Sequence, residues 1–79
     1  MQRITKVSKA NLMAADSAEI VVARQLCDVD WRCLVMVRRG ERTAYLWGAD
    51  EQLWWKSFAE ARRFVKRFRA DLEPTSFDS

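Results

Sequence analysis

Few residues in this chain of 79 could carry out catalysis or hold a metal ion. Histidine is absent, which removes the most common general base and leaves a zinc site short of ligands. Cys27 and Cys33 lack the spacing of metal ligands. The apolar surroundings of Cys33 would raise its thiol pKa, whereas a nucleophilic cysteine needs a lowered pKa. Asp28 and Asp30 are typical of a turn, because Asp hydrogen-bonds its own local backbone. We therefore predict a protein that is not an enzyme, has no metal or cofactor, and keeps both thiols reduced in the cytoplasm.

The basic charge is concentrated in one segment. The chain has 14 Lys and Arg against 11 Asp and Glu, a net charge of +3. Residues 58–72 contain five basic and two acidic residues, so this segment accounts for the whole excess. On a helix, Arg63 would pair with Glu60, and Arg67 with Asp71. The cations left without an acidic neighbour on that helix form one row: Arg62, Lys66 and Arg69.

This row is a candidate surface for an anionic partner, either a phosphate backbone or an acidic protein surface. The alternative is a solvated face whose long side chains cover the rim of the core. A second basic patch lies at a predicted hairpin tip, at Arg38 and Arg39, and its alternative is a solvated turn.

Two adjacent tryptophans, Trp54 and Trp55, supply the third candidate feature. Successive side chains of an extended segment point to opposite sides, so at least one of the two is predicted to be half exposed. Exposed Trp and Arg dominate the energies of protein interfaces, although aromatic rings also fill small cores. The predicted partner-binding residues are Trp54, Trp55, Arg62, Lys66, Arg69, Arg38 and Arg39.

One helix is predicted over residues 57–72. Ser57 and Glu60 have the spacing of a capping box at its start, and Pro74 stops it. Apolar residues recur on one arc of this helix, as in a helix that packs on a core. The residues of this arc that we expect to be largely buried are Phe58, Ala61, Val65, Phe68 and Leu72.

Three antiparallel strands are predicted at residues 18–26, 31–38 and 41–48, where β-branched and aromatic residues gather. Gly40 favours a three-residue hairpin loop that places Val37 opposite Glu41. A two-residue loop at Arg39 and Gly40 would shift the pairing by one and exchange the faces of the partner strand. The predicted fold is α+β, with the helix on one face of a three-stranded antiparallel sheet.

The two ends of the chain are less clearly patterned. Residues 1–17 form either a short helix capped by Ser8 or an edge strand at residues 4–7, and the acidic tail 73–79 is predicted to be flexible. Because both hairpin faces are apolar, the second face needs the N-terminal segment, a second copy of the chain or another partner. We therefore expect a homodimer or an obligatory partner, in a single domain spanning residues 1–79. No apolar run is long enough to cross a membrane, and no signal-type stretch is found, so we expect a cytoplasmic protein.

Two segments carry a resemblance to known proteins. At residues 37–42, Val-Arg-Arg-Gly-Glu-Arg, and 56–64, Lys-Ser-Phe-Ala-Glu-Ala-Arg-Arg-Phe, the chain resembles small β-hairpin-plus-helix proteins of phages and bacteria. Its C-terminal half is similar to the arm-site DNA-binding domain of phage integrases, but residues 48–55 are inserted and the sheet is more apolar. Its size and lack of catalytic groups resemble phage-encoded inhibitors, including anti-CRISPR proteins, a resemblance that assigns no residue.

These observations support two functional hypotheses. The first is a protein-binding module, a phage- or bacterium-encoded inhibitor that blocks a host protein or protein–nucleic-acid complex by occlusion. The alternative is a small nucleic-acid-binding regulator that uses the basic hairpin tip and the basic helix face. A structural subunit of a larger assembly is a third reading.

Overall fold

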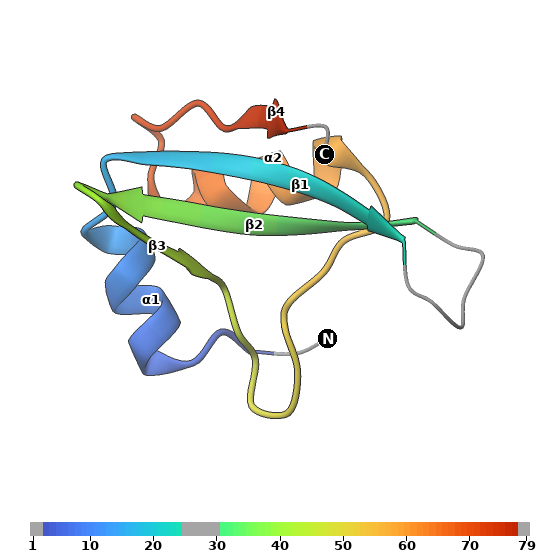
Figure 1. Ribbon diagram of the computed structural model, residues 1–79, viewed down its shortest axis with the longest axis horizontal. Helices are drawn as coiled ribbons and strands as arrows, with labels where there is room; N and C mark the ends of the chain where they lie inside the picture. The colour runs from blue at the N-terminus through green and yellow to red at the C-terminus, as the bar shows by residue number, and fades with distance from the viewer. Residues whose placement is uncertain (1–2, 25–30, 78–79) are drawn as a thin grey trace.

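A computed structural model describes residues 3–24 and 31–77 as a mixed sheet with two helices (Figure 1). The strands lie in the order β3-β2-β1-β4, with antiparallel pairs β1/β2 and β2/β3 and a parallel pair β1/β4. The predicted α+β class is confirmed, but the three-stranded antiparallel sheet is incomplete, because β4 adds a fourth, parallel strand. The elements are α1 (Lys6–Met13), β1 (Ser17–Arg24), β2 (Trp31–Arg39), β3 (Arg42–Tyr45), α2 (Phe58–Phe68) and β4 (Thr75–Phe77).

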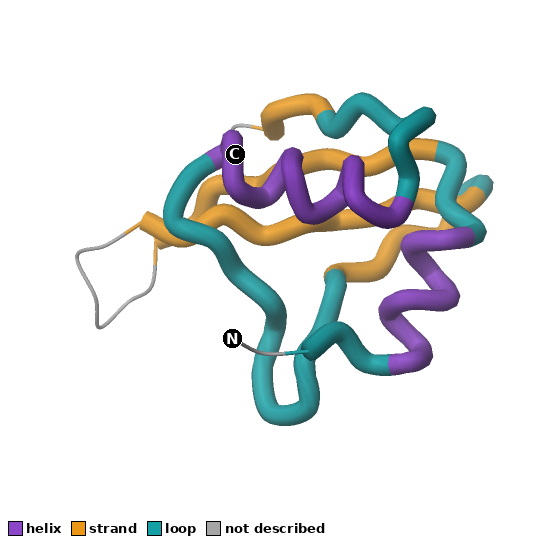
Figure 2. The backbone as a smooth tube through the Cα atoms, turned by 180° about the vertical axis from the view of Figure 1, so that it is seen from behind, coloured by secondary structure: helices purple, strands orange, loops and turns teal. Residues whose placement is uncertain are grey.

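Both helices pack on one face of the sheet, here called the inner face. Figure 2, seen from behind, shows α2 running over it. The register places Ile20 opposite Val35 and Ala18 opposite Val37, so alternate residues of β1 and β2 point into the core. The buried core combines these strands with Leu12 of α1 and residues of α2 and the loops. The fully covered side chains, at 1% exposure or less, are Leu12, Ile20, Val35, Leu46, Ala61 and Val65.

The hairpin between β2 and β3 differs from both predicted arrangements. Arg39 pairs with Arg42, and Val37 pairs with Ala44, so the loop consists of Gly40 and Glu41. Gly40 has φ +59°, which suits the first loop position of a type II′ turn. The predicted pairing of Val37 with Glu41 is therefore wrong. The faces match those of the shifted alternative, because Val37 shares the inner face with Ala44.

The N-terminal segment forms a helix rather than an edge strand. Thr5 caps α1 through a bond from the Ser8 amide to the Thr5 hydroxyl of 3.2 Å. The predicted cap, Ser8, lies inside the helix and is 2% exposed. Because α1 shares the inner face with α2, the described N-terminal residues leave the second face of the sheet uncovered.

The predicted Ser57 cap of α2 is confirmed, but the Glu60 carboxylate contacts the Ser57 hydroxyl and not the Ser57 amide, so the capping box is only half formed. The Ser57 hydroxyl accepts a bond of 3.2 Å from the Glu60 amide, and lies 3.3 Å from the Glu60 carboxylate. The helix ends at Phe68, before the predicted end at residue 72, because Arg69 leaves helical geometry with φ −137° and ψ 80°. Of the predicted apolar arc, Ala61, Val65 and Leu72 are buried and Phe68 is half-buried, whereas Phe58 is 37% exposed, so its predicted burial is wrong.

Within the acidic tail, residues 75–77 form β4, a strand that the sequence did not predict. Pro74 is buried, and β4 pairs with β1 through Ser76 opposite Ile20. The third predicted strand, 41–48, shortens to β3, because the chain turns away from β2 beyond Leu46. The first strand begins at Ser17 and is described to Arg24, and Cys27 and the predicted turn lie outside the described residues.

Candidate functional site

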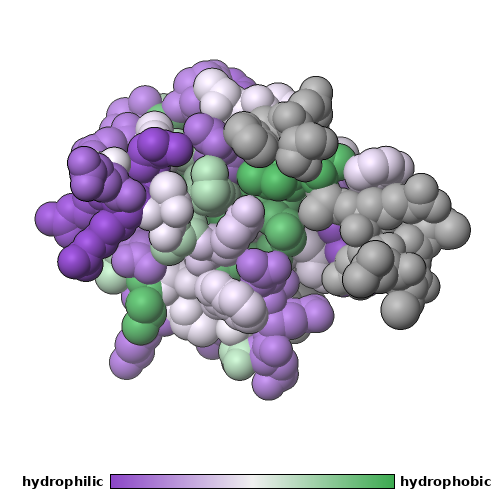
Figure 3. Space-filling view, in the orientation of Figure 1, coloured by the Kyte–Doolittle hydropathy of each residue, from purple (hydrophilic) through white to green (hydrophobic). Residues whose placement is uncertain are grey.

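The face of the sheet opposite the helices, here called the outer face, has no helix over it among the described residues. Figure 3 shows this side of the molecule, with apolar surface over the sheet and strongly hydrophilic surface toward one end. Leu34, Met36 and Tyr45 are half-buried on it, where the inner-face neighbours in β2 are buried. This face therefore presents partly exposed apolar side chains on paired strands.

A short segment beyond β3 extends the sheet beside the start of β2. Cys33 and Trp55 exchange two backbone hydrogen bonds, of 2.8 and 2.9 Å. This pairing fixes the sides of the sheet toward which Trp54 and Trp55 point. The Trp55 ring points inward and lies 4.9 Å from the Phe64 ring. Trp54 therefore points outward, where the Arg32 guanidinium lies 4.2 Å from its ring centroid. The predicted alternation of the two tryptophans is confirmed.

A second tryptophan on this surface, Trp47, is held in place by α1. The Trp47 amide donates to the Ser8 hydroxyl at 2.8 Å, and the Trp47 carbonyl accepts from the Thr5 amide at 3.0 Å. Trp47 also bridges to Gln52 across a tight loop, inside which the Gly48 amide donates to the Glu51 carbonyl at 2.8 Å. Its backbone is therefore fixed while its side chain stays 47% exposed.

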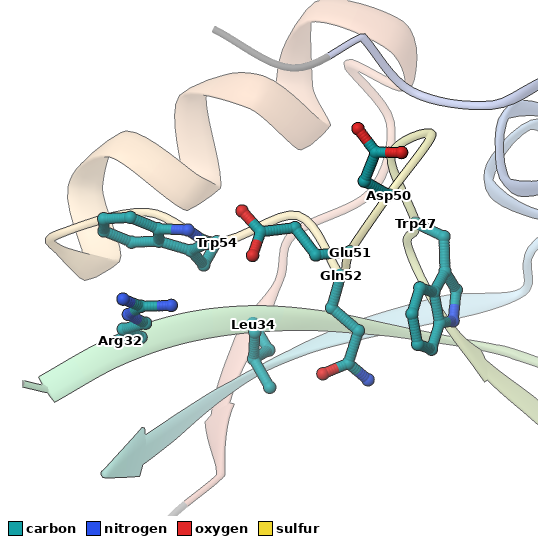
Figure 4. Close-up of a pocket in the computed structure, with 7 residues that line it drawn as sticks. All are labelled: Arg32, Leu34, Trp47, Asp50, Glu51, Gln52 and Trp54. Carbon is teal, nitrogen blue, oxygen red and sulfur yellow. The ribbon is translucent and has the colours of Figure 1, made fainter. Parts of the chain in front are cut away.

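Between these two tryptophans lies an open pocket of about 300 Å³ (Figure 4). In the close-up, Trp54 and Trp47 stand at its two ends, with Leu34 on the strand between them. Two carboxylates and one guanidinium line it, so its formal charge is negative by one unit. The lining residues are Arg32, Leu34, Trp47, Asp50, Glu51, Gln52 and Trp54.

The sequence pointed to only one of these lining residues, Trp54. The alternation of β2 places Arg32 and Leu34 on the face opposite Cys33, but only the long-range pairing of Cys33 with Trp55 brings Trp54 beside them. Asp50, Glu51 and Gln52 lie in the inserted segment 48–55, and no local pattern signals that this segment folds back over the strand.

The predicted row of cations on α2 is paired in the structure. Arg62 makes two bonds to the Glu73 carboxylate, of 2.7 and 2.8 Å. Lys66 lies 3.7 Å from the same carboxylate and donates to the Ala70 carbonyl at 3.1 Å. The bonds from Arg62 lower the pKa of Glu73 below its ordinary value. The expectation that these two cations are unpaired is therefore wrong, although their role toward a partner stays a prediction.

Arg69, the third member of the row, connects the two helices. One of its nitrogens donates to the carbonyls of Leu12, Met13 and Ala15 at 3.2, 2.8 and 2.9 Å. These carbonyls lie at the C-terminal end of α1, where a cation satisfies groups that lack a helical partner. The guanidinium also makes two bonds to Asp71, of 2.9 and 2.7 Å, which lower the pKa of that carboxylate to about 2. Arg69 thus holds α1 against the end of α2.

The predicted pairs Arg63–Glu60 and Arg67–Asp71 do not form. Among the described residues neither Arg63 nor Arg67 has a salt bridge, and both are exposed. Asp71 instead pairs with Arg69, because α2 ends before it could reach Arg67 across a helical turn.

The two arginines predicted at the hairpin tip are exposed at the end of β2. Arg39 lies directly opposite Arg42, and like charges in that position destabilise a strand pair. The turn itself is anchored, since the Asp16 carboxylate accepts a bond of 2.9 Å from the Gly40 amide. The Arg39–Arg42 pair therefore concentrates positive charge at the hairpin tip and lowers the stability of this strand pair.

The remaining candidate groups are the Cys33 thiol and the side chains that could bind a metal ion. Burial raises the pKa of the Cys33 thiol, and the charge of Glu60 raises it further. Within residues 3–24 and 31–77 no three His, Cys, Asp or Glu side chains gather as a metal site would require. No helix in the same ranges combines the length and the apolar character that crossing a bilayer requires.

Comparison with protein-family models, with curated proteins and with solved structures finds no match to this chain.

Proposed function

We propose that this chain is a non-enzymatic protein-binding module that inhibits a host complex by occlusion. The observation that carries the proposal is the outer face of the sheet, which has no helix over it among the described residues and ends in a pocket walled by Trp47 and Trp54. We further propose that the chain acts in the cytoplasm and is encoded by a phage or a bacterium.

Three properties of the outer face support a role in protein binding. Its half-buried apolar side chains, such as Leu34 and Met36, can bury further surface against a partner. Aromatic rings such as those of Trp47 and Trp54 bury large areas at a low cost in conformational entropy. The strands and backbone bonds that hold these groups are rigid, so binding orders few additional residues.

Occlusion requires no chemistry beyond this. A small rigid face that covers a functional surface of the partner prevents its normal ligand from binding there. Since α1 and α2 both cover the inner face, the outer face is the broad apolar surface left for a second copy or another partner. We therefore retain the homodimer as a proposal alongside a host protein.

One observation favours the alternative, a nucleic-acid-binding regulator. The hairpin tip holds Arg38, Arg39 and Arg42 together, all of them exposed. Such a tip fits a phosphate backbone, and the exposed Arg63 and Arg67 of α2 add to the positive surface. Arg62 and Lys66 are paired with Glu73, so a phosphate contact at the row of Arg62, Lys66 and Arg69 receives less support.

Capture of partners from host lysate, with and without nuclease, tests the two hypotheses. Protein binding predicts a partner that survives nuclease treatment and is lost with Leu34→Arg but retained with Arg39→Glu. Nucleic-acid binding predicts the reverse, with an affinity for duplex that falls about 10³- to 10⁵-fold between about 50 and 200 mM salt if several phosphates are contacted. Light scattering distinguishes a homodimer from the 9.3 kDa monomer.

A further inference from the structure

We propose that the pocket between Trp47 and Trp54 receives the positively charged side chain of a lysine or arginine from the protein partner. This inference rests on the proposed protein-binding function, and it names the anchor that the partner supplies.

The size of the pocket suits one side chain. Its volume of about 300 Å³ lies at the lower end of the range for ligand pockets, about 300–1,000 Å³. It is open to solvent, so a side chain can enter while its backbone stays on the surface of the partner. A large cofactor would extend far beyond these walls.

The walls attract positive charge. The face of an indole ring carries a negative potential, and cations bind there within about 6 Å of the ring centroid. This pocket already contains one such contact, since the Arg32 guanidinium lies 4.2 Å from the Trp54 centroid. The exposed ring of Trp47 stands at the other end of the pocket, and is the surface that we assign to the incoming cation.

The carboxylates of the loop add to this attraction. Asp50 and Glu51 lie in the segment that borders the pocket, and the exposed Asp50 carboxylate contributes negative potential at its rim. A phosphate group entering the pocket would meet this negative charge, so the pocket selects against a nucleic-acid backbone. A neutral side chain would gain the apolar contacts with Leu34 but none of the electrostatic attraction.

The walls are also fixed before the guest arrives. The bonds of Trp47 to Ser8 and Thr5 hold one wall against α1, and the pairing of Trp55 with Cys33 holds Trp54 at the other. A preorganised pocket loses little conformational entropy on binding, which is the usual property of a site that accepts an anchor residue.

The test uses small probes and needs no identified partner. N-acetyl-arginine methylamide, N-acetyl-lysine methylamide and the uncharged N-acetyl-citrulline methylamide are titrated into the ¹⁵N-labelled chain at low salt. The indole N–H signals of Trp31, Trp47, Trp54 and Trp55 are followed by NMR. We expect the two cationic probes to shift the signals of Trp47 and Trp54 and to leave that of Trp55 in place. The citrulline probe, which has nearly the shape of arginine, should bind about 2- to 30-fold more weakly.

Variants assign the effect to the pocket. Trp47→Ala and Asp50→Asn should each weaken binding of the arginine probe, whereas Trp31→Ala, at a tryptophan outside the pocket, should not. Asp50 is exposed in a loop, so Asp50→Asn reports on charge even if Trp47→Ala disturbs the fold. Circular dichroism of each variant identifies such a disturbance.

Equal binding of citrulline and arginine, or shifts caused by inorganic phosphate in place of the cations, would overturn the inference. So would the absence of any shift with the arginine probe at saturating concentrations. These results leave the proposed function standing if the lysate still supplies a nuclease-resistant partner that Leu34→Arg abolishes. Conversely, cationic probes that bind while no protein partner is captured would contradict the proposed function and leave the pocket chemistry intact.

Discussion

Removal of the Ser8 hydroxyl should destabilise the protein and loosen one wall of the pocket. Ser8 is 2% exposed, and its hydroxyl accepts the Trp47 amide at 2.8 Å. Ser8→Ala leaves that amide without its acceptor, at a cost of about 1–3 kcal/mol. Alanine is the better helix former by up to about 0.7 kcal/mol, so the net loss is about 1.5 kcal/mol. At about 4–8 °C per kcal/mol for a domain of this size, the melting temperature should fall by about 6–12 °C.

Thermal unfolding followed by circular dichroism measures this change. Asn11→Ala is the matched control, because Asn11 is exposed in the same helix and its replacement should leave the melting temperature unchanged or slightly raised. Hydrogen exchange provides a second measurement, since the Trp47 amide should exchange faster in Ser8→Ala. If Ser8→Ala melts like Asn11→Ala and the Trp47 amide stays protected, α1 does not anchor the pocket and our account of that wall is incorrect.

Three further predictions concern the core and the ion pairs. Leu46→Ala should cost about 2–5 kcal/mol in chemical denaturation, whereas Val7→Ala, at an exposed position, should stay within about 0.5 kcal/mol. The pKa of Asp71 is lowered from 3.8 to about 2 in the folded protein, so its stabilising effect is present above about pH 4 and is lost as the pH falls toward 2. Between these pH values the melting temperature of Asp71→Asn should therefore fall less than that of the unchanged protein. Arg69→Glu should lower the melting temperature, because Arg69 holds the carbonyls of α1, while Arg67→Glu should not; equal stability of the two variants would refute this role.

Local sequence rules predicted the features that depend on neighbouring residues. The Ser57 cap joins residues three positions apart, and the burial of Ala61 and Val65 follows from helical periodicity. The alternation of Trp54 and Trp55 is likewise a local property of an extended chain. Each of these predictions is confirmed because no distant residue competes with the local preference.

The predictions that failed depend on where the chain reverses. The predicted pairing of Arg67 with Asp71 assumed that α2 continues past Phe68. Because α2 ends at Phe68, Asp71 pairs with Arg69 instead. Glu73 was assigned to a flexible tail, but the path into β4 brings its carboxylate to Arg62. No spacing rule foresees either contact, because each arises from a turn set by packing.

The pocket shows the same limit more strongly. Its walls come from β2, from the residues around Trp47 and from the segment that returns through Trp54, and α1 supports one of them from a position distant in sequence. The sequence identified tryptophans suited to an interface, but the neighbours that give the pocket its charge follow only from the strand register and the loop path.

The two edge strands of the sheet affect the tendency of the protein to aggregate at high concentration. The long strands β1 and β2 lie in the interior, while β4 and β3, which are only 3 and 4 residues long, occupy the edges. Short edge strands give other molecules little backbone to pair with, and so oppose aggregation. The Arg62–Glu73 pair secures the chain where it enters β4. Below the pKa of Glu73 that restraint weakens, and release of β4 would expose the edge of β1, an eight-residue strand rich in β-branched side chains. We therefore expect acid to promote fibril-like association through β1, visible as thioflavin fluorescence, and the Arg62–Glu73 pair to oppose it at neutral pH.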